Sequence, residues 1–160
     1  MATAGAGAIN LTATGASGSI TESGAGLINT TGTLTAASVT GETLNGANTV
    51  GTFNATNSTS GNVALTNTAN TLTITGISNT GGGSDTVLNA GAIAITGTVA
   101  TTGAGAINLT ATGASGSITE SGAGLLNTTG TMTAASVTGE TLNGANTVGT
   151  VHATNPIRGN

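Results

Sequence analysis

The chain has 160 residues, including 28 Gly and 37 Thr, one Phe, and no Trp, Tyr or Cys. Only 4% of the residues are charged, with a single Lys or Arg and a net charge of −4. This composition excludes electrostatic binding to nucleic acid or to an anionic membrane surface, because both need clustered positive charge. It also excludes a deep core of aromatic side chains. The abundant Thr, Val and Ile favour β-structure over disorder, since β-branched side chains suit pleated surfaces.

Short runs along the chain alternate apolar and polar residues with the period of two that is typical of strands. The clearest runs are Ala8–Thr12, Thr71–Thr75 and Ala92–Thr96. Breaks such as Asn45–Gly46 and Gly81–Gly83 separate them, and Gly supplies the positive φ that sharp corners need. The Gly and Thr content argues against helices. No apolar run approaches the roughly 18 residues of a membrane-spanning helix, and the first residues do not form a signal peptide.

One internal repeat dominates the sequence: residues 2–62 recur at 100–160, an offset of 98, with 53 of 61 positions identical, and residues 63–99 lie between the copies. Three of the differences exchange one apolar residue for another, as expected of positions in a packed interior. Together with the alternating runs they predict these core residues: Ile9, Leu11, Ile28, Leu34, Val50, Phe53, Leu72, Ile74, Ile93, Ile95, Ile107, Leu109, Leu126, Met132, Val148 and Val151.

A shorter, less regular period lies inside this unit. Gly5–Asn10 matches Gly24–Asn29 at an offset of 19, and Asn45–Val50 matches Asn67–Leu72 at an offset of 22. Such spacings equal one turn of a β-solenoid, which is too short for an independent domain and too long for a hairpin. The sequence therefore predicts a single all-β segment over residues 1–160, a parallel β-helix of about eight coils of roughly 19–22 residues. At the strand spacing, this makes a rod on the order of 40 Å long.

Three segments of the sequence carry a family resemblance: Gly103–Thr110, Gly61–Thr66 and Ala69–Gly76. In their low-complexity style, and over essentially the whole chain, the sequence resembles the repeat region of filamentous haemagglutinin-type adhesins and autotransporter passengers. The resemblance implies a right-handed parallel β-helix that acts as a stalk or fibre on a bacterial cell surface. The secretion-signal and binding domains of that family have no counterpart in these residues, so the resemblance implies a segment of the shaft.

The carboxylates of the chain are Glu22, Glu42, Asp85, Glu120 and Glu140. A paired-carboxylate glycosidase would need two converging acids in a cleft lined by aromatic residues, which this chain lacks. Glu22 and Glu42 are separated by one coil length, so in adjacent coils they could stack on one corner and bind a cation. The alternative is that these side chains are exposed, solubilising corners.

Two further motifs are weak candidates for a metal or catalytic site. Gly81–Asp85 resembles the calcium-binding repeat of other β-rolls, but it lacks the required ligand spacing and does not recur in tandem. His152 has no Cys or second His for a zinc site and no paired nucleophile. We therefore predict no catalytic, cofactor-binding or metal-binding residues, no cofactor, and no enzyme activity.

Asn residues at successive corners predict a structural ladder, because each side-chain amide can donate to one coil and accept from another. Asn48 and Asn70, which match at the same offset as Asn45–Val50 and Asn67–Leu72, are the predicted pair.

These observations lead to an expected function: a non-catalytic shaft or fibre segment of an extracellular bacterial adhesin. Its expected partners are the rest of a longer chain or further copies of itself, stacked end to end or laterally, and a host receptor stays unknown. The alternative is an ice-binding solenoid that presents Thr-x-Thr arrays, as at Thr31–Thr35 and Thr71–Thr75. Coils of unequal length argue against this alternative, because they make a single flat Thr face hard to maintain.

Overall fold

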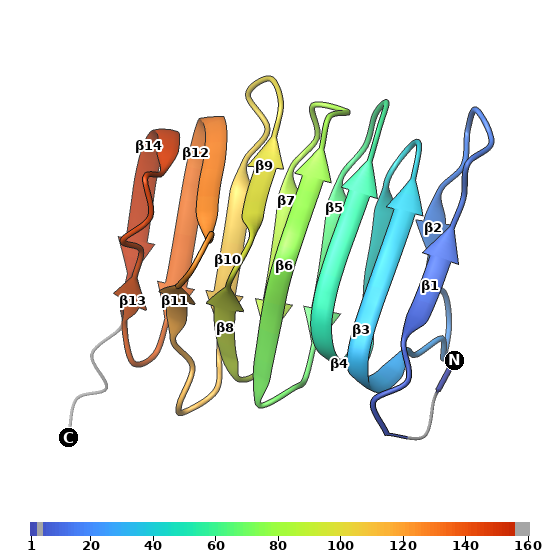
Figure 1. Cartoon of the computed structure of the whole chain (residues 1–160), viewed down its shortest axis with the longest axis horizontal. Helices are drawn as coiled ribbons and strands as arrows, with labels where there is room; N and C mark the ends of the chain where they lie inside the picture. The colour runs from blue at the N-terminus through green and yellow to red at the C-terminus, as the bar shows by residue number, and fades with distance from the viewer. Residues whose placement is uncertain (3–4, 156–160) are drawn as a thin grey trace.

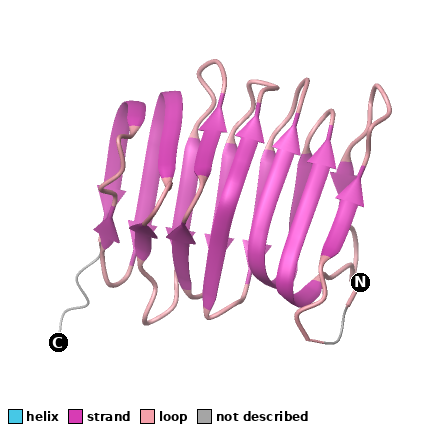
Figure 2. Ribbon diagram, in the orientation of Figure 1, coloured by secondary structure: helices cyan, strands magenta, loops and turns pink. Residues whose placement is uncertain are grey.

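The computed structural model describes residues 1–2 and 5–155, and within them it contains strands, turns and loops but no helix (Figures 1 and 2). The strands stack in parallel as a right-handed β-helix of about 7 turns, which confirms the predicted fold class. The chain advances along the rod, so its first and last strands lie at opposite ends (Figure 1). The strands are β1 (Ile9–Thr12), β2 (Ile20–Thr21), β3 (Asn29–Ser38), β4 (Glu42–Asn57), β5 (Val63–Asn67), β6 (Thr71–Asn79), β7 (Asp85–Asn89), β8 (Ala92–Ile95), β9 (Thr98–Thr101), β10 (Ile107–Ala111), β11 (Ile118–Glu120), β12 (Leu125–Ser136), β13 (Glu140–Thr141) and β14 (Thr147–Thr154).

Two ladders of parallel strands form the broad faces of the rod. The β1 face follows the pairing order β1–β3–β4–β6–β8–β11–β13. The β2 face follows β2–β4–β5–β7–β10–β12–β14. Strand β4 bends around a corner, so that residues 42–48 belong to the β2 face and residues 52–57 to the β1 face. Strand β9 extends the β1 face between β6 and β12.

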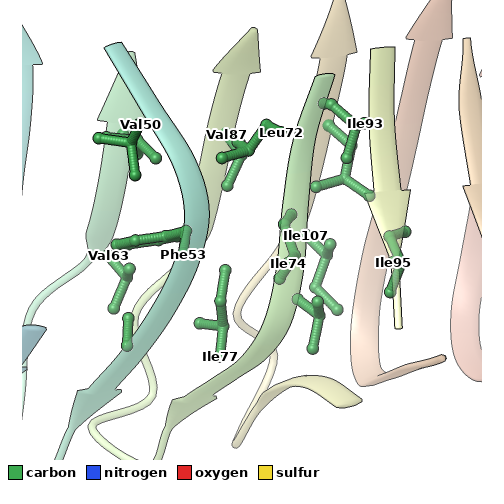
Figure 3. Packing of buried hydrophobic residues seen from close by; sticks show 14 of the residues in the cluster. Val50, Phe53, Val63, Leu72, Ile74, Ile77, Val87, Ile93, Ile95 and Ile107 are labelled. Carbon is green, nitrogen blue, oxygen red and sulfur yellow. The ribbon is translucent and has the colours of Figure 1, made fainter. Parts of the chain in front are cut away.

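Aliphatic side chains from both faces fill the narrow space between the two sheets (Figure 3). Leu34, Phe53 and Ile74 illustrate the packing, because they pair in register on three successive rungs and are fully buried. Burying one such side chain contributes roughly 1.5–3 kcal/mol. A thin interior of Ile, Leu and Val therefore stabilises the rod without an aromatic core.

Most of the predicted core residues point into this interior. Leu11 and Val148 are only partly buried, and Val151 is 54% exposed, contrary to the prediction. Val151 lies on β14, the outermost rung of the β2 face, and no further rung of the described chain covers it. The buried ones are Ile9, Ile28, Leu34, Val50, Phe53, Leu72, Ile74, Ile93, Ile95, Ile107, Leu109, Leu126 and Met132.

The coils vary in length more than the sequence predicts, and they number about 7 rather than eight. Ile9 pairs with Leu34, and Leu34 pairs with Phe53, but the first of these two steps covers distinctly more of the chain. The additional residues of the longer coil are divided between the loop from β1 to β2 and the segment from β2 to β3. Because these two segments take up the difference, the strands stay in register.

The 98-residue repeat spans nine half-turns, or four and a half coils, so one repeat unit does not hold a whole number of coils. Inward residues at successive half-turns alternate between the β1 face and the β2 face. The two sequence copies therefore lie on opposite faces: Ile9 is on the β1 face, and its copy Ile107 is on the β2 face. The alternating positions are Ile9, Ile20, Leu34, Glu42, Phe53, Val63, Ile74, Asp85, Ile95 and Ile107.

Close stacking of the coils requires glycine at specific corners. A Cβ on Gly97 would lie 1.9 Å from the Thr75 carbonyl oxygen of the preceding coil. Gly61 has a φ of +89°, and a Cβ there would lie 2.3 Å from the Thr40 carbonyl oxygen. Any larger residue at these positions would push neighbouring coils apart.

Candidate functional site

The acidic side chains occupy two kinds of environment, partly exposed and fully buried, which their residue type alone does not distinguish. Glu22 and Glu120 lie at corners of the rod and are partly exposed. Glu42 and Asp85 lie in the interior with no exposed surface. Glu140, the repeat copy of Glu42, is partly exposed on the outermost strand of the β1 face. The expectation that Glu22 and Glu42 are exposed corners is therefore wrong for Glu42.

Glu22 holds a tight Asn-Gly corner of the next coil. Its Oε2 accepts hydrogen bonds from the Gly46 backbone N–H at 2.8 Å and from Asn48 Nδ2 at 3.0 Å. Asn48 in turn accepts a bond from the Ile28 N–H at 2.7 Å. The carboxylate thus replaces ladder hydrogen bonds where the strand register shifts between Leu44 and Asn48.

The second copy repeats this corner on the other side of the rod. Glu120 Oε2 accepts from the Gly144 N–H at 2.7 Å and from Asn146 Nδ2 at 3.0 Å. Shallow hollows of about 200 Å³ and 190 Å³ adjoin Glu22 and Glu120, and each is lined by the same residues at the repeat offset. Because these carboxylates are occupied in joining coils, we interpret both corners as structural.

The buried Glu42 and Asp85 share one column of the β2 face, on either side of Val63. Burial raises the pKa of Glu42 to about 7, with a hydrogen bond from Ser38 opposing the rise and the Asp85 charge adding to it. Burial also raises the pKa of Asp85 to about 7, opposed by a hydrogen bond from Asn79. Both carboxyl groups are therefore prone to hold a proton near neutral pH.

The alternation of the strands already predicts that Glu42 and Asp85 point inward, although charged residues are usually expected at the surface. In the alternation of β4, Glu42 is in phase with the buried Leu44, and in β7, Asp85 is in phase with the buried Val87. The period of two thus points both acids inward, whereas the usual exposure of charged residues points them outward.

Asparagine ladders do form inside the rod, but between other residues than the predicted pair. Asn57 Nδ2 donates to Asn79 Oδ1 at 3.0 Å, and Asn67 Nδ2 donates to Asn89 Oδ1 at 3.0 Å. Asn48 pairs in register with Asn67 instead of Asn70, and Asn70 is exposed in a turn. The alignment by a constant offset fails here because β4 has an irregular register after Leu44.

The proposed metal motifs do not assemble a site. Asp85 points into the sealed interior, so the segment from Gly81 to Asp85 does not present a carboxylate to a surface ion. His152 is exposed on β14. Among residues 1–2 and 5–155, no group of three His, Cys, Asp or Glu side chains converges as metal ligands would.

The outward surface of the β1 face carries a regular column of threonines. Thr33, Thr52 and Thr73 pair in register on successive rungs, and after Ala94 the column continues. Its last members are Thr119 and Thr141. Loops absorb the unequal coil lengths, so the column persists although coil length varies.

The described part of the chain has no helix long and apolar enough to cross a bilayer. Comparisons with protein-family models, with curated proteins and with solved structures find no match to the chain.

Proposed function

We propose that the chain is a non-catalytic shaft segment of an extracellular bacterial surface fibre or adhesin. The observation that carries this proposal is the pair of continuous parallel ladders, in which each added coil lengthens the rod without changing its cross-section. The resemblance of the sequence to haemagglutinin-type repeat regions supports the same role. Corner glutamates that join neighbouring coils by hydrogen bonds also fit a rigid spacer.

A shaft makes a simple prediction about length. Because one repeat unit spans four and a half coils, adding one unit should lengthen the particle by about 22 Å at constant width. Small-angle scattering of chains with one and two additional units measures both quantities. Growth in width, or growth in length by much less than this step, would reject the shaft function.

Further copies of the chain are proposed as partners at the ends of the rod. Within the described chain, the outermost strands β1 and β14 each pair along one edge only, and such edges accept another strand. Leu27 and Val151 near these ends are 47% and 54% exposed. Electron microscopy at increasing concentration should show end-to-end rods of uniform width, whereas particles that stay single at every concentration would reject this partnership.

Ice binding is a second candidate because of the threonine column on the β1 face. Its hydroxyl groups recur at the strand spacing of about 4.8 Å on a sheet surface. A thermal-hysteresis measurement tests this directly, with Thr52→Tyr and Thr73→Tyr as variants that interrupt the column. Thr86→Tyr on the β2 face is the matched control. Absence of hysteresis in the unsubstituted protein would remove the candidate.

A further inference from the structure

Five polar side chains form a connected row inside the rod, at the corner where the β1 face turns into the β2 face. Ser38 Oγ lies 3.2 Å from Glu42 Oε1 and 3.2 Å from Asn57 Oδ1. Asn57 Nδ2 donates to Asn79 Oδ1 at 3.0 Å, and Asn79 Nδ2 donates to Asp85 Oδ1 at 3.0 Å. None of the five side chains is more than 6% exposed. The row thus connects two buried carboxyl groups that belong to different coils.

Backbone carbonyls fix the orientation of both amides. Asn57 Nδ2 also faces the carbonyl oxygens of Ser60 at 2.9 Å and Gly61 at 3.0 Å, so its two protons are shared among three acceptors and its NH2 group cannot exchange places with its oxygen. Asn79 Nδ2 likewise faces the Gly61 carbonyl oxygen, at 3.4 Å. Both side-chain oxygens must therefore act as acceptors from the preceding member of the row.

The Ser38 hydroxyl group has too few protons for the acceptors that surround it. It has one proton but lies against two acceptors, Glu42 Oε1 and Asn57 Oδ1. If Ser38 donates to Asn57, an ionised Glu42 faces only a hydroxyl lone pair. Its Oε2 has no hydrogen-bond partner among the described residues either. A buried carboxylate without any donor is strongly unfavourable.

We infer that Glu42 binds a proton at neutral pH and donates it to Ser38, so that one directed chain of hydrogen bonds runs from Glu42 to the Asp85 carboxylate. In this arrangement Glu42 donates to Ser38, Ser38 to Asn57, Asn57 to Asn79, and Asn79 to Asp85. Every donor in the row has an acceptor. The interior corner is therefore a specific proton-binding site, and its two carboxyl groups have different roles.

The surroundings favour a proton over a metal ion. The buried side chain of Val63 lies between Glu42 and Asp85 in the same column, so the two carboxyl groups do not close around one ion. Of the strands that pack against this corner, β2, β3, β5, β6 and β7, only β7 supplies another titratable side chain, Asp85. Glu22, just beyond β2, bonds to Gly46 and Asn48 instead. Burial raises the pKa of both Glu42 and Asp85 to about 7, so the hydrogen-bond geometry decides which of the two binds a proton first.

Carbon-13 NMR of the side-chain carboxyl groups in the whole chain tests the inference. As the pH is lowered through about 7, we expect the Glu42 carboxyl carbon to reach its protonated shift before the Asp85 carboxyl carbon does. Glu42→Gln keeps a donor toward Ser38, so this variant should fold normally and should lose the part of the acid-dependent change in melting temperature that Glu42 supplies. Glu140→Gln, the same substitution in the second repeat copy, should leave that change in place.

Three results would overturn the inference. One is a Glu42 carboxyl group that is ionised at about pH 6. Another is the reverse order, with Asp85 protonated and Glu42 ionised. The third is a rise in melting temperature with added calcium that Glu42→Gln removes, which would identify a cation as the ligand of this corner.

Discussion

The two copies of the repeat, residues 2–62 and 100–160, have nearly the same sequence but different surroundings. Glu42 is sealed inside the rod, whereas its copy Glu140 is partly exposed. Phe53 is fully buried, whereas its copy Val151 is 54% exposed. Copy 1 is covered by the coils of residues 63–99, and the end of copy 2 is an outermost rung. In a solenoid, therefore, the neighbouring coil decides the environment of a residue as much as its own sequence does.

The largest difference in stability between matched substitutions in the two copies is expected at Phe53 and its counterpart Val151. Phe53→Ala should cost about 3–5 kcal/mol, because it removes the largest buried side chain and leaves a cavity. Val151→Ala should change stability by no more than about 0.5 kcal/mol, because Val151 is exposed. Urea unfolding followed by circular dichroism measures both. Equal losses of stability in the two variants would contradict the burial of Phe53 beneath the coils of residues 63–99.

A second difference concerns pH. Because the folded-state pKa of Glu42 is raised from 4.5 to about 7, the stabilising neutral form is present at acidic pH and is lost as the pH rises through about 7. Glu42 should therefore lower the stability by on the order of 3 kcal/mol between about pH 4 and pH 8. The dependence of unfolding on pH should be shallower in Glu42→Gln than in Glu140→Gln, and Asp85 should supply the dependence that is left in Glu42→Gln. Equal slopes in the two variants would show that Glu42 is not the responsible group.

A smaller difference in stability is expected for Asn48 and Asn146, the asparagines that follow the two Asn-Gly corners. Asn48 and Asn146 both accept from a backbone N–H at 2.7 Å and donate to a glutamate at 3.0 Å. Asn48 alone also faces the carbonyl oxygens of Leu44 and Thr66. Asn48→Ala should cost about 1–3 kcal/mol and Asn146→Ala about 1 kcal/mol, as measured by urea unfolding. A larger cost at Asn146 would contradict these contacts.

The smallest difference is expected at the corner glutamates themselves. Glu22 and Glu120 make the same two hydrogen bonds with nearly the same lengths. Glu22→Gln and Glu120→Gln should each cost about 1 kcal/mol and agree within about 0.5 kcal/mol. Thermal unfolding of the two variants checks this. A clear inequality would mean that the corners differ in ways that their geometry does not show.

Much of the fold follows from the sequence because repeat length and alternation report directly on coils and strands. The column of Leu34, Phe53 and Ile74 was predictable as core, since each residue lies in an alternating run and two of them vary only among apolar types. The half-turn relation of the copies was not predictable. It depends on strand pairings across coils of unequal length, which no local pattern reveals.

The interior polar groups show where residue type misleads. Glu42 and Asp85 follow the inward phase of their strands, but a charged residue is normally expected outside. Asn48 was matched to Asn70 by a constant offset, whereas the irregular register after Leu44 pairs it with Asn67. In both cases, the correct placement requires the partner groups of a neighbouring coil, which one strand alone does not specify.

The two copies lie on opposite faces of the rod because one repeat unit spans four and a half coils. Asn108, the copy of Asn10, pairs with Thr86 on the β2 face, whereas Thr119, the copy of Thr21, lies on the β1 face. Cysteines in place of Thr86 and Asn108 should therefore form a disulfide on mild oxidation, since adjacent strands bring them within bonding range. Cysteines in place of Thr86 and Thr119 should stay reduced. A disulfide in the second pair and none in the first would contradict the account.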